Sequence, residues 1–407
     1  MDKEPHRSKR VFCCNRCLRY NMNIAFIHDV FPSGGAERVT IDIATYLADC
    51  GKNYNVYVYC HSITPELLTD ELHKYMTIRH MNVTSNVEKS KHIERLILSD
   101  KIDIVVQVVH RLYDIEGIKM RTGVKVVMAN HGEPFWQRFR FITKAQKRNP
   151  VAWVLYKKFW YLYCGHAMRK AVKNTRTNYD SCDAYVVLCD AYKELLCRRL
   201  KLNMAESHMF VIGNSEKPVN DVCYDKENVI MYCGRLYNGT KALDALLRIW
   251  KRIQDKIPDW KLVLVGDGPD RPLLEKQISK DKIDRVIFAG WSADVASYYR
   301  KASIVCLTSR TESWGLALTE AQAHGAIPVS FGCSDGVRSI LSPSGENGFI
   351  VTPGDESEFS RTLLHIISMS EEDKMRIRKN VVRKSFDYSP EQVGSLWSEL
   401  FDNLVKS

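Results

Sequence analysis

The chain has 407 residues, of which 45% are hydrophobic and 26% are charged, and it contains 13 Cys. This composition is typical of a globular protein long enough for two domains, and the absence of any run of about 18 apolar residues argues against a membrane-spanning helix. Because the cysteines are scattered and odd in number, and no secretory signal opens the sequence, we expect reduced thiols in a cytoplasm. We interpret residues 1–22 as an N-terminal extension, either disordered or the product of a start codon placed before the true start at Met22.

The first half of the chain alternates short apolar runs with helical patterns. Strands are predicted at 23–28, 55–60, 102–109, 125–129, 184–188 and 209–212, and the first helix at 36–48. Runs of this length fit buried strands, and residues 36–48 carry apolar side chains at helical spacing. Strands that alternate with helices pair in parallel through right-handed crossovers, so residues 23–213 are predicted to form one Rossmann-like domain.

The same pattern restarts after a linker rich in turn-favouring residues, around 213–224. Strands are predicted at 229–233, 261–265, 286–289, 302–307 and 327–330, and helices at 243–253, 292–300 and 315–324. Residues 214–385 should therefore form a second domain, and the last helix, within 386–407, should pack back across the junction. The predicted fold is α/β, with two doubly wound parallel-sheet domains facing a central cleft.

The net charge of +11 is unevenly distributed. Residues 1–220 hold 34 Lys and Arg against 22 Asp and Glu, whereas residues 221–407 hold 25 against 26. Residues 134–179 contain 11 basic residues and no acidic one. Aromatic side chains are interleaved with them: Trp153, Tyr156, Phe159, Trp160, Tyr161 and Tyr163. This mixture suits the headgroup layer of an anionic membrane or an acidic acceptor. The alternative is a helical face packed on its own domain. Nucleic acid is disfavoured because no binding motif accompanies the tract.

Two segments of the first half lie where ligands bind in parallel sheets, at strand carboxyl ends beside helix starts. Gly34 and Gly35 follow the first strand; glycines let a backbone approach a ligand, and free amides at a helix start attract phosphate. His131 follows strand 125–129 and could bond a sugar hydroxyl or shuttle a proton. A structural turn and a structural histidine are the alternatives. No Walker loop or G-x-G-x-x-G sequence occurs, which disfavours NAD.

The second half contributes two charged segments at equivalent positions. Arg235 and Lys241 lie between strand 229–233 and the next helix, where two cations and a helix start suit a diphosphate. Such groups would stabilise the charge that a leaving diphosphate gains. Glu312 precedes helix 315–324 and Glu320 lies inside it, so both carboxylates could accept hydrogen bonds from hydroxyl groups. The amides that start this helix are those of Trp314, Gly315 and Leu316.

These segments together resemble the family-4 retaining glycosyltransferases of the GT-B fold, of the type found in bacterial polysaccharide and lipopolysaccharide biosynthesis. The resemblance covers about residues 23–401. It rests on GGAERV (34–39), VVLCDAYKELL (186–196), VIGN (211–214), the Gly234-Arg235…Lys241 segment, VGDGP (265–269), FAGW (288–291) and ESWGLALTEAQAHGAIPV (312–329). Two positions depart from the usual family pattern: the spacing from Arg235 to Lys241 is one residue longer, and Cys189 stands where Ser is common.

The resemblance implies a role for each candidate residue. Residues 23–213 would form the acceptor domain and 214–385 the nucleotide-sugar donor domain. The implied catalytic residues are Glu312, Arg235, Lys241 and His131. The implied donor-binding residues are Gly34, Gly35, Gly290, Trp291, Trp314, Gly315, Leu316 and Glu320. Arg235 and Lys241 would bind the diphosphate, Glu320 the ribose hydroxyls and Glu312 the sugar hydroxyls. The backbone at Gly290 and Trp291 would contact the base.

The expected function is transfer of a hexose or N-acetylhexosamine from a nucleotide diphosphate sugar, a UDP-sugar, to a saccharide or lipid-linked saccharide. The expected location is the cytoplasm, with contact to the inner membrane face. No cofactor or metal is expected, since no D-x-D triplet appears, and no protein nucleophile is assigned. Two alternatives remain: a sugar-nucleotide epimerase or hydrolase on the same fold, which would show further acid/base carboxylates near the sugar, and a non-catalytic nucleotide-sugar-binding protein, which would lack Glu312, Arg235 or Lys241.

Overall fold

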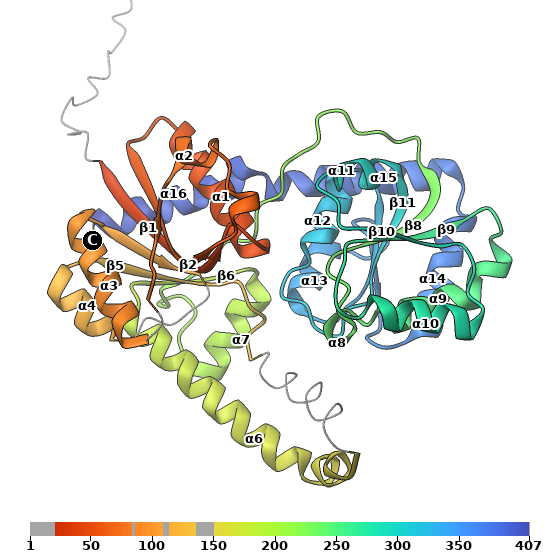
Figure 1. Ribbon diagram of the computed structural model, residues 1–407, viewed down its shortest axis with the longest axis horizontal. Coiled ribbons are helices and arrows are strands. Elements are labelled where there is room, and N and C mark those ends of the chain that lie inside the picture. Colours follow the sequence, from red (N-terminus) through yellow and green to blue (C-terminus); the bar gives the residue numbers. More distant parts are fainter. Residues whose placement is uncertain (1–20, 84–85, 109–113, 136–149, 407) are drawn as a thin grey trace, which may run out of the picture.

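The computed structural model describes residues 21–83, 86–108, 114–135 and 150–406, without the side chains of residues 86–87 and 150–164. All but the last two residues of the predicted extension therefore lie outside the described residues. Two α/β domains lie side by side (Figure 1), and each is built on a parallel sheet. Over the described ranges, no helix combines the length and apolar character that crossing a bilayer requires.

In the described residues, the N-terminal domain contains a seven-stranded parallel sheet with the order β3-β2-β1-β4-β5-β6-β7. Its strands are β1 (Met22–Phe31), β2 (Tyr54–Ile63), β3 (Thr77–His80), β4 (Ile104–Gln107), β5 (Lys125–Asn130), β6 (Ala184–Val187) and β7 (Met209–Val211). Its helices are α1 (Gly35–Asp49), α2 (Leu72–Tyr75), α3 (Asn86–Ser99), α4 (Ile115–Thr122), α6 (Pro150–Ser181) and α7 (Asp190–Leu200). Every residue of β4 and β6 is buried, as expected for strands covered by helices on both faces.

The C-terminal domain contains, within the described residues, a six-stranded parallel sheet with the order β10-β9-β8-β11-β12-β13. Its strands are β8 (Glu227–Cys233), β9 (Lys261–Val265), β10 (Val286–Gly290), β11 (Ala302–Leu307), β12 (Ile327–Phe331) and β13 (Phe349–Val351). Its helices are α8 (Asn238–Lys241), α9 (Leu243–Ile253), α10 (Arg271–Asp281), α11 (Ala296–Lys301), α12 (Leu316–Ala323), α13 (Asp335–Leu341), α14 (Glu356–Ser368) and α15 (Glu371–Ser385). The prediction of two doubly wound parallel-sheet domains is confirmed.

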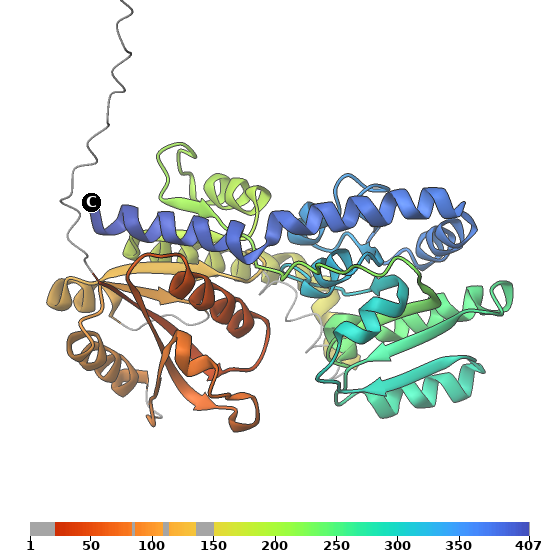
Figure 2. The ribbon, with the colours of Figure 1, turned by 90° about the horizontal axis from the view of Figure 1, so that it is seen from above.

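The last helix, α16 (Pro390–Lys406), leaves the C-terminal domain and lies along the N-terminal one (Figure 2). Its buried side chains, with Trp397 and Phe401 among them, join the core around β1 and α1, and the rings of Phe401 and Phe26 meet edge to face at 6.5 Å. A β-carbon on Gly394 would lie 2.3 Å from the ring of Tyr46, so glycine lets α16 approach α1 closely. The helix therefore joins the two domains through buried apolar surface.

One predicted helix begins later than its pattern suggested. Residues 292–300 were expected to be helical, but α11 covers only Ala296–Lys301. The Ser292 hydroxyl accepts a hydrogen bond from the amide of Asp294, and the Asp294 carboxylate accepts one from the amide of Ser297. These local side-chain bonds replace the first helical turn, which is the usual way that Ser and Asp compete with a helix.

Candidate active site

Two helix N-termini, one from each domain, meet where the carboxyl edges of the two sheets face each other. Gly34 caps α1 with φ 116°, and Gly315 caps α12 with φ 100°. A β-carbon on Gly35 would lie 2.9 Å from Leu316 Cδ1, so the start of α1 packs directly against the first residue of α12. Helix starts leave amides without intrahelical partners and carry the positive end of the helix dipole. The junction is therefore suited to an anion.

Lys241 and Glu312 form an ion pair beside these helix starts. Lys241 Nζ donates to Glu312 Oε2 at 2.5 Å, and the Ser309 hydroxyl donates to the same oxygen at 3.2 Å. Their side chains are 25% and 17% exposed, so the pair borders solvent without being free in it. The pair places a cation and a hydrogen-bond acceptor next to each other, as binding a phosphate and a hydroxyl together requires.

The loop that carries Arg235 is held by contacts between backbones. Gly234 and Gly266 have φ of 142° and 121°, and a β-carbon on Gly266 would lie 2.1 Å from the Gly234 carbonyl oxygen. The fully buried Leu236 fixes the loop from the next position, and its amide donates to the Asp267 carbonyl at 2.9 Å. The Arg235 side chain is exposed and, within the described part of the chain, forms no ion pair. Its guanidinium is thus available to a ligand.

Glu320 is held by groups from both domains. Arg38, on α1, donates to one of its oxygens and, through its other terminal nitrogen, to Glu216 at 2.8 Å. The buried Tyr299 hydroxyl donates to the second Glu320 oxygen at 2.5 Å. Sequence reasoning assigned no role to Arg38 or Glu216. A signal was present, since Arg38 stands one helical turn after Gly35 in GGAERV and Glu216 follows VIGN by two residues.

The carboxylates around Arg38 are unusually buried. Glu216 is 3% exposed, and Asp42, which accepts from the Ser215 hydroxyl at 2.7 Å, is equally buried. Burial raises the pKa of Glu216 to about 8, although the neighbouring guanidinium acts in the opposite direction. Burial opposes the charge of Arg38, but the surrounding carboxylates raise the pKa of its guanidinium. Arg38 therefore stays charged and connects the carboxylates of the two domains.

His131 lies on a loop that docks onto the Glu312 segment. Its Nδ1 is 2.8 Å from the Asn214 side-chain oxygen, and burial lowers the pKa of the ring to about 4. Two residues further, the Glu133 amide donates to the Ser313 hydroxyl, and Glu133 Oε2 accepts from the Thr311 hydroxyl, both at 3.1 Å. The structure thus brings the His131 segment to the Glu312 segment, with the ring neutral at neutral pH.

The remaining candidates differ in which of their atoms reach the junction. The Trp314 ring is buried against Tyr388, edge to face at 5.4 Å, so only its backbone amide is left for a ligand. Gly290 has φ 76°, and its carbonyl accepts from the Gly266 amide at 2.7 Å, which puts it beside the Arg235 loop. The Trp291 side chain is exposed. The roles proposed for these residues stay predictions.

Two doubly wound parallel-sheet domains that meet at their carboxyl edges define the GT-B class of fold. A family model described as Glycosyltransferase Family 4 matches residues 33–215, and one described as Glycosyl transferases group 1 matches residues 227–369. The chain belongs to the glycosyltransferases that these two models describe, and the resemblance to family-4 glycosyltransferases of the GT-B fold is confirmed. The retaining mechanism stays a prediction.

Relatives and solved structures are similar to the chain over nearly its whole length. A glycosyltransferase of Haemophilus influenzae is 26% identical over 91% of this chain and 97% of its own. A Campylobacter jejuni enzyme that transfers N-acetyl-D-galactosamine to a diphospho-undecaprenol-linked saccharide is 22% identical over 93% of this chain and 98% of its own. Anabaena HepE in complex with UDP-glucose has a TM-score of 0.71 at 17% identity, covering 95% of this chain and 100% of the other. This structural likeness shows the shared fold.

Proposed function

We propose that the chain is a retaining glycosyltransferase that moves a hexose or N-acetylhexosamine from a UDP-sugar to a saccharide or lipid-linked saccharide in cell-envelope or capsule polysaccharide synthesis. The observation that carries the proposal is the meeting of two helix N-termini, α1 and α12, beside the cation Lys241. The exposed Arg235, on the loop after β8, is proposed to supply a second cation. A diphosphate is the ligand that such a junction neutralises best.

The proposed reaction step follows from the negative charge that develops on the leaving diphosphate. When the bond between the sugar carbon and the β-phosphate oxygen breaks, the nucleoside diphosphate gains negative charge, and Lys241, Arg235 and the helix-start amides stabilise it. The acceptor hydroxyl attacks the same face of the sugar while the departing phosphate oxygen takes its proton, so configuration is retained without a protein nucleophile. Because side-chain cations and amides supply the positive charge, we propose that the reaction needs no metal ion.

The hydroxyl groups of the donor would be bound by the two glutamates. Glu312 lies next to the proposed phosphate site, through its ion pair with Lys241, and is proposed to accept hydrogen bonds from the sugar. Glu320, which accepts from the Tyr299 hydroxyl, is proposed to accept from the ribose. The neutral His131 ring would bond the sugar from the N-terminal domain.

The names of similar proteins support the choice of donor and acceptor. HepE was solved with UDP-glucose, and the Campylobacter enzyme acts on a diphospho-undecaprenol-linked saccharide. Residues 134–179 are proposed to contact an anionic membrane on the cytoplasmic face, where a lipid-linked acceptor would be found. Residues 136–149 and the side chains of 150–164 lie outside the described residues. The first half of α6 projects away from the N-terminal sheet in Figure 1.

The proposal is tested by incubating the protein with a panel of UDP-sugars, each with and without lipid-linked saccharide acceptors and with and without EDTA. We expect sugar transfer from one donor with retained anomeric configuration and the same rate in EDTA. Conversion of the UDP-sugar into its epimer, or acceptor-independent hydrolysis as the sole reaction, would favour the alternative enzyme class. Nucleotide-sugar binding without turnover for any acceptor would favour a binding protein.

A further inference from the structure

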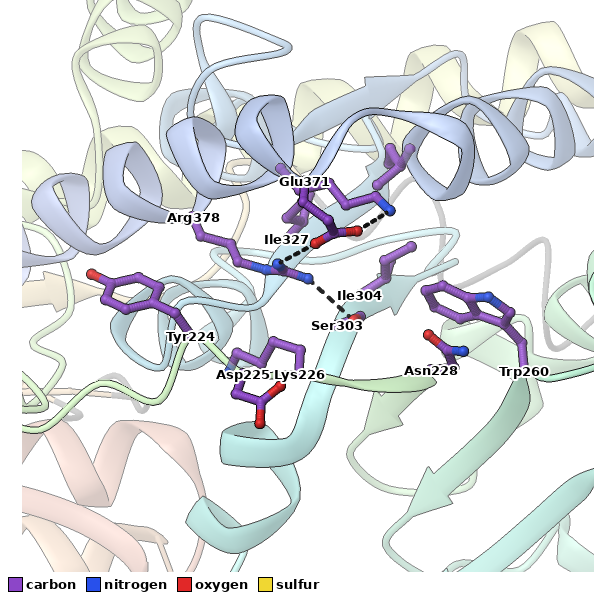
Figure 3. A pocket seen from close by; sticks show the side chains of 12 residues that line it. Tyr224, Asp225, Lys226, Asn228, Trp260, Ser303, Ile304, Ile327, Glu371 and Arg378 are labelled. Carbon is purple, nitrogen blue, oxygen red and sulfur yellow. Dashed lines mark hydrogen bonds and ion pairs between the residues drawn. The ribbon is translucent and has the colours of Figure 1, made fainter.

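A polar pocket lies in the C-terminal domain, at the edge of the sheet opposite the candidate active site. It has a volume of about 100 Å³. Its lining residues come from the segment before β8, from the amino ends of β8, β11 and β12, from the residue before β9, and from α14 and α15. The polar ones include Lys374 and, labelled in Figure 3, Asn228, Ser303, Glu371 and Arg378. The strands between the two edges are five to seven residues long, which separates the two sites by about 16–23 Å at ~3.3 Å per residue. The pocket is thus distinct from the donor site.

Arg378 is a buried cation whose hydrogen bonds are incomplete. The residue is 5% exposed, and its guanidinium lies in the middle of the pocket (Figure 3). One terminal nitrogen donates to the Ser303 hydroxyl at 3.2 Å, and the other is 3.8 Å from a Glu371 oxygen. The Nε atom is buried and, among the described residues, has no hydrogen-bond partner. Burial of this incompletely paired charge lowers the pKa of Arg378 and costs free energy that a bound anion would recover.

At the mouth of the pocket, the Glu371 carboxylate is the shared ion-pair partner of Lys374 and Arg378. The mostly buried Lys374 donates through Nζ to the other Glu371 oxygen at 2.8 Å. Glu371 is the first residue of α15, and its side chain is 79% exposed, so it can swing into solvent without leaving a buried cavity. The Glu371 carboxylate thus lies between Lys374 and Arg378, and another anion could take its place there.

The other charged residues of the lining leave the net charge inside the pocket positive. Lys226 Nζ donates to three carbonyl oxygens, those of Tyr299, Arg300 and His324, so it adds positive charge but no free donor. The Asp225 carboxylate points away from the Arg378 guanidinium (Figure 3). With Glu371 turned outward, the interior would hold cations with no carboxylate against them.

We propose that this pocket binds a tetrahedral oxyanion, the phosphate of inorganic phosphate or of a small phosphate monoester, between Arg378 and Lys374 with Glu371 displaced into solvent. A pocket volume of about 100 Å³ is enough for one phosphate group with ordered water beside it. Guanidinium and ammonium groups form their strongest hydrogen bonds with such anions. The site goes beyond the proposed transfer reaction and does not depend on it.

Binding can be measured by calorimetry on the full-length protein with saturating UDP present, so that the donor site does not compete for phosphate. We expect inorganic phosphate to bind the wild type and to bind Lys374→Ala at least tenfold more weakly. Glu371→Gln should bind at least threefold more tightly, because the competing carboxylate loses its charge. A damaged fold cannot produce this gain. Lys261→Ala, which removes an exposed lysine paired with Glu227 at the amino end of β9, is the matched control and should bind like the wild type.

A second titration, with glycerol phosphate in place of inorganic phosphate, distinguishes a site for a phosphate ester from a site for free phosphate. Tighter binding would assign the pocket to a phosphate ester, and equal or weaker binding would assign it to free phosphate. If the wild type binds neither compound while UDP is bound, the pocket holds water only and the proposal is overturned. Wild-type phosphate affinity in both Lys374→Ala and Glu371→Gln would overturn it as well. Arg378→Lys would complete the series, but the outcome does not depend on whether this variant folds.

Discussion

Replacing Lys241 with alanine tests the proposed diphosphate site directly. The substitution removes one of the two cations proposed to bind the diphosphate and leaves Glu312 with the Ser309 hydroxyl as its partner. Because the two side chains are 25% and 17% exposed, water can solvate the unpaired carboxylate. We therefore expect a stability loss of about 1 kcal/mol or less, as for other ion pairs that border solvent, and a folded protein.

The expected effect on turnover is larger than the effect on stability. A unit charge about 4 Å from a developing charge contributes roughly 2–4 kcal/mol at an effective dielectric constant of about 20–40. Since about 1.4 kcal/mol corresponds to a tenfold change in rate, this amounts to about 30- to 1000-fold. Glu312 already neutralises part of the Lys241 charge in the unliganded site, which reduces the net effect. We expect kcat to fall at least tenfold, and we expect the same for Arg235→Ala.

The assay is initial-rate transfer from the preferred UDP-sugar, measured with thermal unfolding of the same samples. Lys261→Ala is the matched control, because Lys261 also forms an ion pair, with Glu227 at 3.1 Å, but on the opposite edge of the sheet. Its kcat should stay within twofold of the wild type. Full activity in Lys241→Ala, or an equal loss in Lys261→Ala, would refute the assignment of a phosphate to the junction.

Three further predictions concern pH and membranes. Because burial raises the pKa of Glu216 to about 8, the folded protein holds a proton between pH 4.5 and 8 that the unfolded chain has released. The free energy of unfolding should therefore fall as pH rises from 4.5 to 8, by at most about 1.4 kcal/mol per pH unit. Urea unfolding should show a smaller fall for Glu216→Gln. Because the pKa of His131 is lowered to about 4, its ring stays neutral at pH 6. The pH profiles of kcat for the wild type and for His131→Asn should therefore have the same shape near pH 6.5. The stability that the neutral ring contributes is fully present above about pH 6.5 and is lost as pH falls through 4. Finally, the protein should sediment with anionic liposomes at low salt and be released by added salt; failure to bind at low salt would leave residues 134–179 to packing on their own domain.

Much of the fold, and the chain positions of the candidate site residues, were predictable because they depend on short-range patterns. Alternating apolar runs and helical spacing indicate strands and helices wherever they occur, and their repetition indicated two parallel sheets. The candidate residues at strand ends, such as Arg235 and Glu312, follow from position along the chain alone. The pattern failed at 292–300, where hydrogen bonds from Ser292 and Asp294 delay the helix.

Contacts between distant segments were decided only by the tertiary structure. Arg38 and Glu320 are 282 positions apart, and no local pattern relates them until the two domains meet. Burial, too, is a property of packing: it turns the Trp314 ring away from the junction, raises the pKa of Glu216, and leaves Arg378 short of partners. The physical reason is that the cost of burying a charge or a polar group depends on every atom around it, and most of those atoms belong to residues far away in the chain.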